Sequence, residues 1–202
     1  METIVNKILS RIYGHGRGWS FTPKDFADCG ERSTIDTTLT RLVKKGVIRK
    51  ALRGVYDYPR FSKLFGAPVS PDPYAIAYAI ARSFGWSISP SGETALNLLG
   101  LSTQVPAAHY FFSDGPTRTY AWSGGVLTFT KRAVKETSAL TPKTAMIVQA
   151  LKALGENNVT PETILQLRKQ LSDKEIKTAL REAQYVTGWV YLLIKKIAET
   201  EH

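Results

Sequence analysis

The sequence has few of the residues that build disulfides, metal centres and catalytic sites. Its 202 residues include one cysteine, Cys29, and three histidines. One cysteine excludes an internal disulfide and a cysteine-based metal site, so Cys29 is expected to be a small, partly buried side chain. No metalloprotease, thiol-pair or serine–histidine–aspartate spacing occurs in the sequence. These absences predict a protein that is not an enzyme and that uses no metal or cofactor.

Long hydrophobic runs are also missing. No apolar stretch approaches the roughly 20 residues that a membrane-spanning helix needs. Near the N-terminus, the apolar positions that a signal peptide requires are interrupted by polar side chains, namely Asn6, Lys7, Ser10 and Arg11. The sequence therefore predicts a cytoplasmic protein with no membrane partner. Its hydrophobic content of 43% is enough for the core of one or two domains.

Acidic residues are scarce relative to basic ones, and the imbalance is uneven along the chain. The formal net charge is +10, of which residues 1–60 carry +6, residues 61–140 carry +2 and residues 141–202 carry +2. A basic excess concentrated in one segment is typical of a nucleic-acid-binding domain.

Within residues 1–60, the stretch from Thr22 onward carries the signals of a short helix. Thr22 and Asp25 have the spacing of a capping box, and Phe21 and Phe26 have that of a hydrophobic staple. Gly30 is expected to end this helix as its C′ residue. An amphipathic helix with isoleucines four residues apart precedes it and is expected to pack behind it.

A second helix and a basic hairpin are expected to follow. Ser33 is expected to open the helix, with an acid three residues on, and Gly46 to end it. Residues 47–50 and 55–58 then read as two strands that end at Pro59. The order helix, turn, helix, hairpin is that of a winged helix-turn-helix, in which the second helix enters the major groove.

The second helix has one apolar face and one polar, basic face. Ile35, Leu39, Leu42 and Val43 follow the helical period on the apolar side. In the hairpin, strand alternation is expected to place Arg49 and Arg53 on the outer side. Such hydroxyl and cationic side chains bind bases and phosphates. The predicted DNA-binding residues are Ser33, Thr34, Thr37, Thr38, Arg41, Lys44, Lys45, Arg49, Lys50 and Arg53.

The rest of the chain predicts a second domain of mixed structure. Residues 60–71 are interpreted as a proline-containing linker, and residues 74–84 as an apolar helix. Three strands are expected at 109–113, 118–122 and 126–131, and helices after Thr141. The fold class is thus α+β. The predicted domains are residues 1–60, a winged helix-turn-helix that binds DNA, and residues 61–202, an α+β domain with a small antiparallel sheet and C-terminal helices.

Two stretches give the chain a family resemblance. Residues Leu39–Pro59, "LTRLVKKGVIRKALRGVYDYP", and residues Ser89–Pro106, "SPSGETALNLLGLSTQVP", followed by "HYFFSD", resemble AbiEi antitoxins of type IV toxin–antitoxin and abortive-infection systems. The resemblance covers about residues 1–140. It implies an N-terminal domain that binds double-stranded DNA at its own promoter and represses its operon. It also implies a C-terminal domain that counteracts a toxin.

The resemblance implies a partner as well. The toxin is a nucleotidyltransferase-like protein encoded next to the antitoxin, and the two act without a stable complex. The residues themselves leave two other functions open. One is a ligand-responsive winged-helix transcriptional repressor, and the other is an adaptor whose basic face meets an acidic protein.

Overall fold

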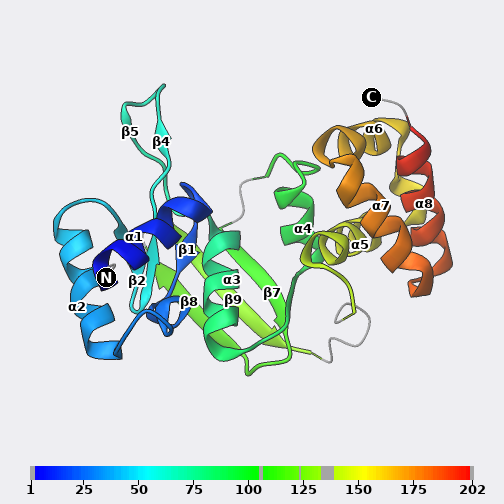
Figure 1. Cartoon of the computed structure of the whole chain (residues 1–202). Coiled ribbons are helices and arrows are strands. Elements are labelled where there is room, and N and C mark those ends of the chain that lie inside the picture. The colour runs from blue at the N-terminus through cyan, green and yellow to red at the C-terminus, as the bar shows by residue number, and fades with distance from the viewer. Residues whose placement is uncertain (1–2, 105–106, 123, 133–138, 201–202) are drawn as a thin grey trace. The chain divides into compact units, whose positions relative to one another are not determined.

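The protein forms two compact units in a computed structural model that describes residues 3–104, 107–122, 124–132 and 139–200 (Figure 1). One unit consists of Met1–Trp86 with Tyr120–Val126, and the other of Ser87–Thr119 with Leu127–His202. The fold is α+β, as the sequence predicts.

The first unit opens with the predicted winged helix-turn-helix. Strands β1, β3 and β2 form an antiparallel sheet in that order, and the helices precede or separate them. The elements are α1 (Ile4–His15), β1 (Ser20–Phe21), the 3₁₀ turn η1 (Pro23–Phe26), α2 (Arg32–Lys44), β2 (Arg49–Leu52) and β3 (Val55–Asp57).

Local signals around η1 explain how the chain turns between the helices. The Asp25 carboxylate accepts a hydrogen bond from the backbone N–H of Thr22 at 2.7 Å, which confirms the capping box. The rings of Phe21 and Phe26 meet edge to face with centroids 5.4 Å apart, as a staple requires. Gly30 has a different role from the one expected. A Cβ atom there would lie 2.7 Å from Cδ1 of Ile4, so glycine allows α1 to pack closely.

The core of this unit lies between α1, η1, α2 and the wing. Its buried side chains come from each of these elements, so the three-helix arrangement and the sheet share one apolar interior. Cys29 is part of this core, as the sequence predicts. The other members are Ile8, Ile12, Phe21, Phe26, Ile35, Leu39, Leu42 and Ile48.

The segment expected to be a linker is instead a second hairpin. Strands β4 (Phe61–Ser62) and β5 (Ala67–Pro68) pair antiparallel, and Figure 1 shows them extending away from the wing. Two-residue strands are too short to show a period, so the sequence pattern did not reveal them.

Helix α3 (Pro73–Phe84) belongs to the first unit and packs on β1. Arg82 on this helix donates to the Ser20 carbonyl oxygen at 3.0 Å and to Asp25 Oδ1 at 3.1 Å. Asp72 caps the helix by accepting from the Tyr74 N–H at 3.0 Å. The first unit thus extends beyond residue 60, where the sequence analysis places the functional boundary.

The second unit contains a group of helices and most of a small sheet, of which Tyr120–Val126 belong to the first unit. Strands β6 (Ile88–Pro90), β7 (Ala108–Ser113), β9 (Gly125–Lys131) and β8 (Arg118–Trp122) form a sheet in that order. Strand β9 lies between β7 and β8, so the sheet is not a simple meander. Helix α4 (Gly92–Leu98) follows β6 and packs against α5 (Pro142–Leu154).

Helices follow Thr141, as the sequence predicts. Ser172 and Glu175 form a capping box, with the Ser172 N–H donating to Glu175 Oε2 at 2.8 Å. The remaining elements are η2 (Glu156–Asn158), α6 (Pro161–Gln170), α7 (Asp173–Glu182), η3 (Ala183–Tyr185) and α8 (Gly188–Glu199). Among the described residues, none of the helices is both long and apolar enough to cross a membrane.

Candidate nucleic-acid interface

Helix α2 starts two residues earlier than the sequence pattern indicated. Its N-cap is Glu31, whose backbone is extended, and Arg32 is the first helical residue. Ser33 is therefore not the N-cap but an exposed residue of the first turn. Arg32 pairs with Asp36 one turn later at 2.9 Å, so the acid at the edge of the outer face is neutralised by a neighbour.

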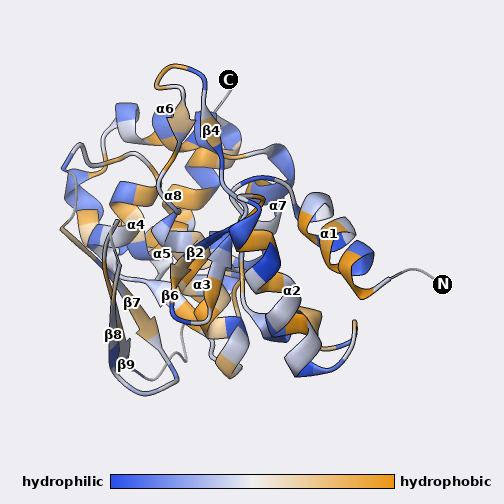
Figure 2. Cartoon of the chain, turned by 90° about the vertical axis from the view of Figure 1, so that its left-hand side faces the viewer, coloured by the Kyte–Doolittle hydropathy of each residue, from blue (hydrophilic) through white to orange (hydrophobic). Residues whose placement is uncertain are grey.

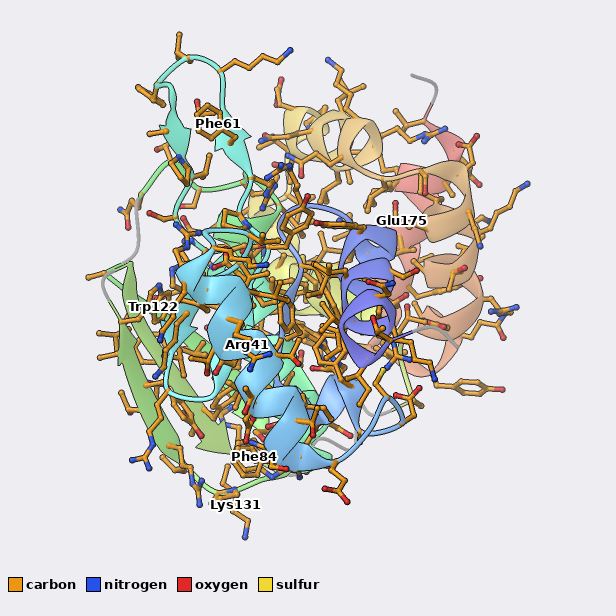
Figure 3. All side chains as sticks on the ribbon, turned by 60° about the vertical axis from the view of Figure 1, so that its left-hand side comes forward. Arg41, Phe61, Phe84, Trp122, Lys131 and Glu175 are labelled. Carbon is orange, nitrogen blue, oxygen red and sulfur yellow. The ribbon has the colours of Figure 1, made fainter. Side chains whose placement is uncertain are left out.

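The outer face of α2 is open to solvent along the whole helix. The side of α2 that carries Arg41 faces outward in Figure 3. The Thr37 hydroxyl on this face has a fixed direction, because its Oγ1 donates a hydrogen bond to the Ser33 carbonyl oxygen at 2.9 Å. The lone pairs of this oxygen can still accept a hydrogen bond from a ligand. The predicted residues exposed here are Ser33, Thr34, Thr37, Arg41, Lys44 and Lys45.

One residue of this face was missed by the sequence analysis. Thr40 is exposed, and its hydroxyl donates to the Asp36 carbonyl oxygen at 2.8 Å. It lies three residues after Thr37 and four before Lys44, so the helical period places it in the same stripe. This spacing would have been enough to predict from the sequence that Thr40 lies on the outer face.

Thr38 is a correction to the predicted set. It is 4% exposed and faces the core rather than the outer side of α2. The reason is its spacing: Thr38 lies three residues after Ile35 and four before Leu42, which are both buried. The Thr38 side chain therefore lies on the apolar face of α2 and does not reach a partner bound to the outer face.

The cations of the outer face have no carboxylate partner. Within the described part of the chain, the exposed side chains Arg41, Lys44, Lys45, Lys50 and Arg53 form no ion pair. Their charge is not neutralised by the protein, so it is available to an anionic partner. Arg41 and Lys44 lie on α2, Lys45 is its C-cap residue, and Lys50 and Arg53 lie on the wing.

Arg49 is a second correction, because its charge is already used inside the protein. It lies directly opposite Asp57 in the sheet, and its guanidinium donates two hydrogen bonds to that carboxylate at 2.9 and 2.7 Å. The Asp57 side chain is 3% exposed. The hydrogen bonds from Arg49 to Asp57 raise the pKa of the guanidinium. Arg49 therefore holds the wing together, and a role on its outer surface is not supported.

Two of the three basic residues predicted on the outer side of the wing are exposed. Lys50 and Arg53 are exposed, and Gly54 closes the turn with a φ of 79°, a conformation that other residues rarely adopt. The register shifts between Lys50 and Leu52, which breaks the strict alternation on which the sequence analysis relied.

Within the described ranges, no three histidine, cysteine, aspartate or glutamate side chains come together as a ligand set. Asp28, which follows η1, is an ionisable group with a marked pKa shift. A hydrogen bond from Arg11 lowers its pKa to about 2.

The second sequence motif forms a junction within the second unit. It runs from β6 through α4 to a loop, and its last two residues, 105 and 106, lie outside the described residues. Thr94 is buried and accepts a hydrogen bond from the Tyr110 N–H at 2.9 Å, which ties α4 to β7. A hollow of about 490 Å³ borders this helix, lined in part by Glu93, Asn97 and Tyr110.

Three comparisons place the chain among known proteins. Residues 7–180 match a family described as "Family of unknown function (DUF6088)". No curated protein matches the chain. Among solved structures, the crystal structure of RV2827C protein from Mycobacterium tuberculosis is 14% identical, with a TM-score of 0.37, over 89% of this chain and 71% of that one.

Proposed function

The chain belongs to the DUF6088 family, and we propose that it is a DNA-binding antitoxin that represses its own operon. Its first unit binds double-stranded DNA at its own promoter, and its second unit counteracts a nucleotidyltransferase-like toxin encoded beside it. The protein acts by binding rather than by catalysis, and it forms no stable complex with the toxin.

The observation that carries the DNA-binding part is the outer face of α2. Arg41, Lys44 and Lys45 are exposed there without a carboxylate partner, on the helix that a winged helix-turn-helix inserts into the major groove. Arg41 has the geometry to bind guanine through two hydrogen bonds, while lysines bind phosphates as point charges. The threonine hydroxyls beside them suit either bases or phosphates.

The wing supports the same assignment. Lys50 and Arg53 are exposed on the hairpin that follows α2, and neither forms an ion pair within the described part of the chain. In a winged helix this hairpin lies along the DNA backbone next to the recognition helix. Phosphate contacts from these two residues would fix the register of α2 without reading sequence.

The antitoxin part rests on the resemblance of two stretches to AbiEi antitoxins. The first lies on α2 and the wing, and the second on β6, α4 and the start of β7, in two different compact units. Their order and spacing along the chain fit a protein in which promoter binding and toxin neutralisation have separate parts.

Titration of DNA by gel shift or anisotropy tests the first part. The duplex is the region upstream of the protein's own gene, and a scrambled duplex measures non-specific binding. Arg41→Ala should weaken specific binding by about 1–3 kcal/mol and relax the preference at one base position. Lys44→Ala should weaken both duplexes alike and lower the slope of log K against log salt by about 0.9.

The matched control is Lys169→Ala, which removes an exposed lysine from α6 in the second unit. This variant should bind DNA as the unchanged protein does. Unchanged affinity in both α2 variants would rule out α2 as the DNA-reading helix.

Co-expression with the adjacent gene tests the second part. Induction of that gene alone should stop growth, and the full chain should restore it. The triple variant Arg41→Ala, Lys44→Ala, Lys45→Ala should still rescue growth while it loses repression. An adjacent gene without toxicity would contradict the antitoxin assignment and favour the ligand-responsive repressor.

A further inference from the structure

The β4–β5 hairpin presents hydrophobic side chains to solvent at its tip. Leu64 is 86% exposed and Phe65 is 80% exposed, and Phe61 and Val69 are exposed further down. Figure 2 shows the hydrophobic colour at the end of this hairpin, above the wing. Large neighbouring apolar side chains left in water mark an interaction surface.

The hairpin has a defined base, so its tip is held in a fixed place relative to the wing. Phe61 pairs with Pro68, and the Val69 N–H donates to the Arg60 carbonyl oxygen at 2.8 Å. Arg49 of β2 donates to the Val69 carbonyl oxygen at 2.8 Å while it pairs with Asp57. One guanidinium therefore joins the second hairpin to the wing.

A second arginine supports the entry to the hairpin. Arg17 donates to the Pro59 carbonyl oxygen at 2.8 Å, and its guanidinium lies 4.7 Å from the centroid of the Tyr58 ring. Both ends of the hairpin are thus anchored to residues of the winged helix. Figure 3 shows Phe61 on the hairpin and Arg41 on α2, within the same unit.

The charge of the hairpin is of one sign. Between Asp57 and Asp72 the sequence contains Arg60 and Lys63 and no acid. Arg60 approaches Asp72 at 3.8 Å, while Lys63 is exposed at the tip and has no partner among the described residues. A basic side chain beside two apolar ones fits a partner that offers both anionic and stacked apolar groups. Duplex DNA is such a partner.

We propose that the β4–β5 hairpin is a second DNA-contacting arm. It inserts Leu64 and Phe65 into the minor groove of the duplex that α2 reads, while Lys63 contacts a phosphate. This inference rests on the proposed function. Apolar wedges of this kind unstack a base step and bend the duplex by roughly 20–90°. The hairpin therefore adds DNA bending to the reading of sequence by α2.

A second copy of the chain is a less suitable occupant. Each strand of the hairpin has two residues, so its edges offer few backbone groups for pairing with another strand. The positive tip would also repel an identical tip. The positive charge of the hairpin favours DNA over a second copy of the chain, and the test below distinguishes the two.

The test measures bending of bound DNA by energy transfer between dyes at the two ends of a duplex. The duplex spans the region that the full-length protein protects upstream of its own gene. The double variant Leu64→Ser, Phe65→Ser removes the wedge. Because these side chains are exposed, its thermal unfolding should match that of the unchanged protein. The control is Tyr185→Ser, which removes an aromatic side chain that is 94% exposed in the second unit.

The unchanged protein and the control should bend the duplex by roughly 20–90°. The double variant should protect the same region but leave the duplex straight, with an affinity about tenfold lower, equivalent to about 1.4 kcal/mol. A bound but straight duplex with the unchanged protein would overturn the proposal. Equal bending by the double variant would also overturn it.

Sedimentation without DNA gives the remaining outcome. If the unchanged protein is a dimer and the double variant a monomer, the hairpin is a protein contact and the proposal is wrong. A protein that does not bind any duplex contradicts the proposed function itself, and the arm is then rejected with it. That result is distinct from a bound, straight duplex.

Discussion

Two arginines of the wing, Arg49 and Arg53, carry the same charge but have different surroundings. Arg49 is bonded to a buried carboxylate and to the base of the second hairpin, whereas Arg53 is exposed at the turn. An arginine that already satisfies a buried acid stabilises the fold, and an exposed one is available to a ligand.

We expect Arg49→Ala to lower the free energy of unfolding by about 2 kcal/mol, because it leaves the Asp57 carboxylate buried without its partner. Arg53→Ala should leave stability unchanged and lower the salt slope of DNA binding by about 0.9. Urea unfolding and binding titrations at several salt concentrations measure the two effects. Equal stability of the two variants would contradict the assignment of a structural role to Arg49 and a binding role to Arg53.

The sequence identified most side chains of the outer face of α2 but misplaced Thr38 and Arg49. Thr38 was misplaced because a threonine suits either side of a helix edge, and only its spacing from Ile35 and Leu42 indicated burial. Arg49 was misplaced because its partner is set by strand register. The register of β2 against β3 depends on the bulge near Ala51, which the local sequence pattern does not predict.

A further prediction at the residue scale concerns the stability of the protein at low pH. Arg11 donates two hydrogen bonds of 2.7 Å to Asp28, which joins α1 to the segment before α2. They lower the pKa of Asp28 from 3.8 to about 2 in the folded protein. The contribution of Asp28 to stability is therefore present above pH 4 and is lost as the pH falls towards 2.

We expect Asp28→Asn to flatten the loss of stability between pH 4 and pH 2, because the substituted side chain no longer gains a proton on unfolding. Urea unfolding at a series of pH values measures this. Glu156→Gln removes an exposed acid on η2 and controls for the change in net charge. A pH profile of Asp28→Asn that matches the unchanged protein would contradict the role of the pair.

At the scale of elements, helices were more predictable than strands. Caps are local signals that a sequence carries, and Asp72 before α3, Ser91 before α4 and Ser172 before α7 are such N-caps. The order of strands in a sheet is set by long-range packing. The position of β9 between β7 and β8 therefore could not be read from three strands in sequence.

Arg168 on α6 shows how one buried cation can join elements. It is 9% exposed, and it bonds to Asp173 at 2.7 Å and to the carbonyl oxygen of Thr200 at 2.9 Å. Its guanidinium links α6 to the start of α7 and the end of α8, which a polar pattern alone does not reveal.

Arg168→Ala should lower the free energy of unfolding of the second unit by about 2–3 kcal/mol, since it leaves backbone acceptors unpaired and removes a packed stem. Arg168→Lys should restore little, because an ammonium group lacks the planar fork that serves several acceptors. Lys169→Ala is the exposed neighbouring control and should change stability by less than about 0.5 kcal/mol. Urea unfolding followed by circular dichroism distinguishes the three variants.

At the scale of the whole molecule, the first compact unit is larger than a winged helix alone. It includes α3, whose Arg82 bonds to both β1 and η1. A fragment of residues 1–60 would lose this helix and expose the surface of β1 beneath it. Domains of this size are already marginal in stability.

We therefore expect residues 1–86 to unfold cooperatively in urea and to bind duplex DNA, and residues 1–60 to show neither property. Circular dichroism and binding titrations of both fragments measure this. A 1–60 fragment with a sharp unfolding transition would show that α3 is dispensable for the winged helix. The expected boundary at residue 60 would then describe an independent fold.

The first unit is also discontinuous along the chain, because it takes in Tyr120–Val126 after a long excursion through the second unit. During synthesis, its two parts leave the ribosome at different times. At ~5–20 residues per second, Tyr120 follows Trp86 by roughly 2–7 s. Folding of α1, α2 and the wing takes far less time than this. A nascent chain thus exposes the basic face of α2 to solvent before its first unit has received its final segment.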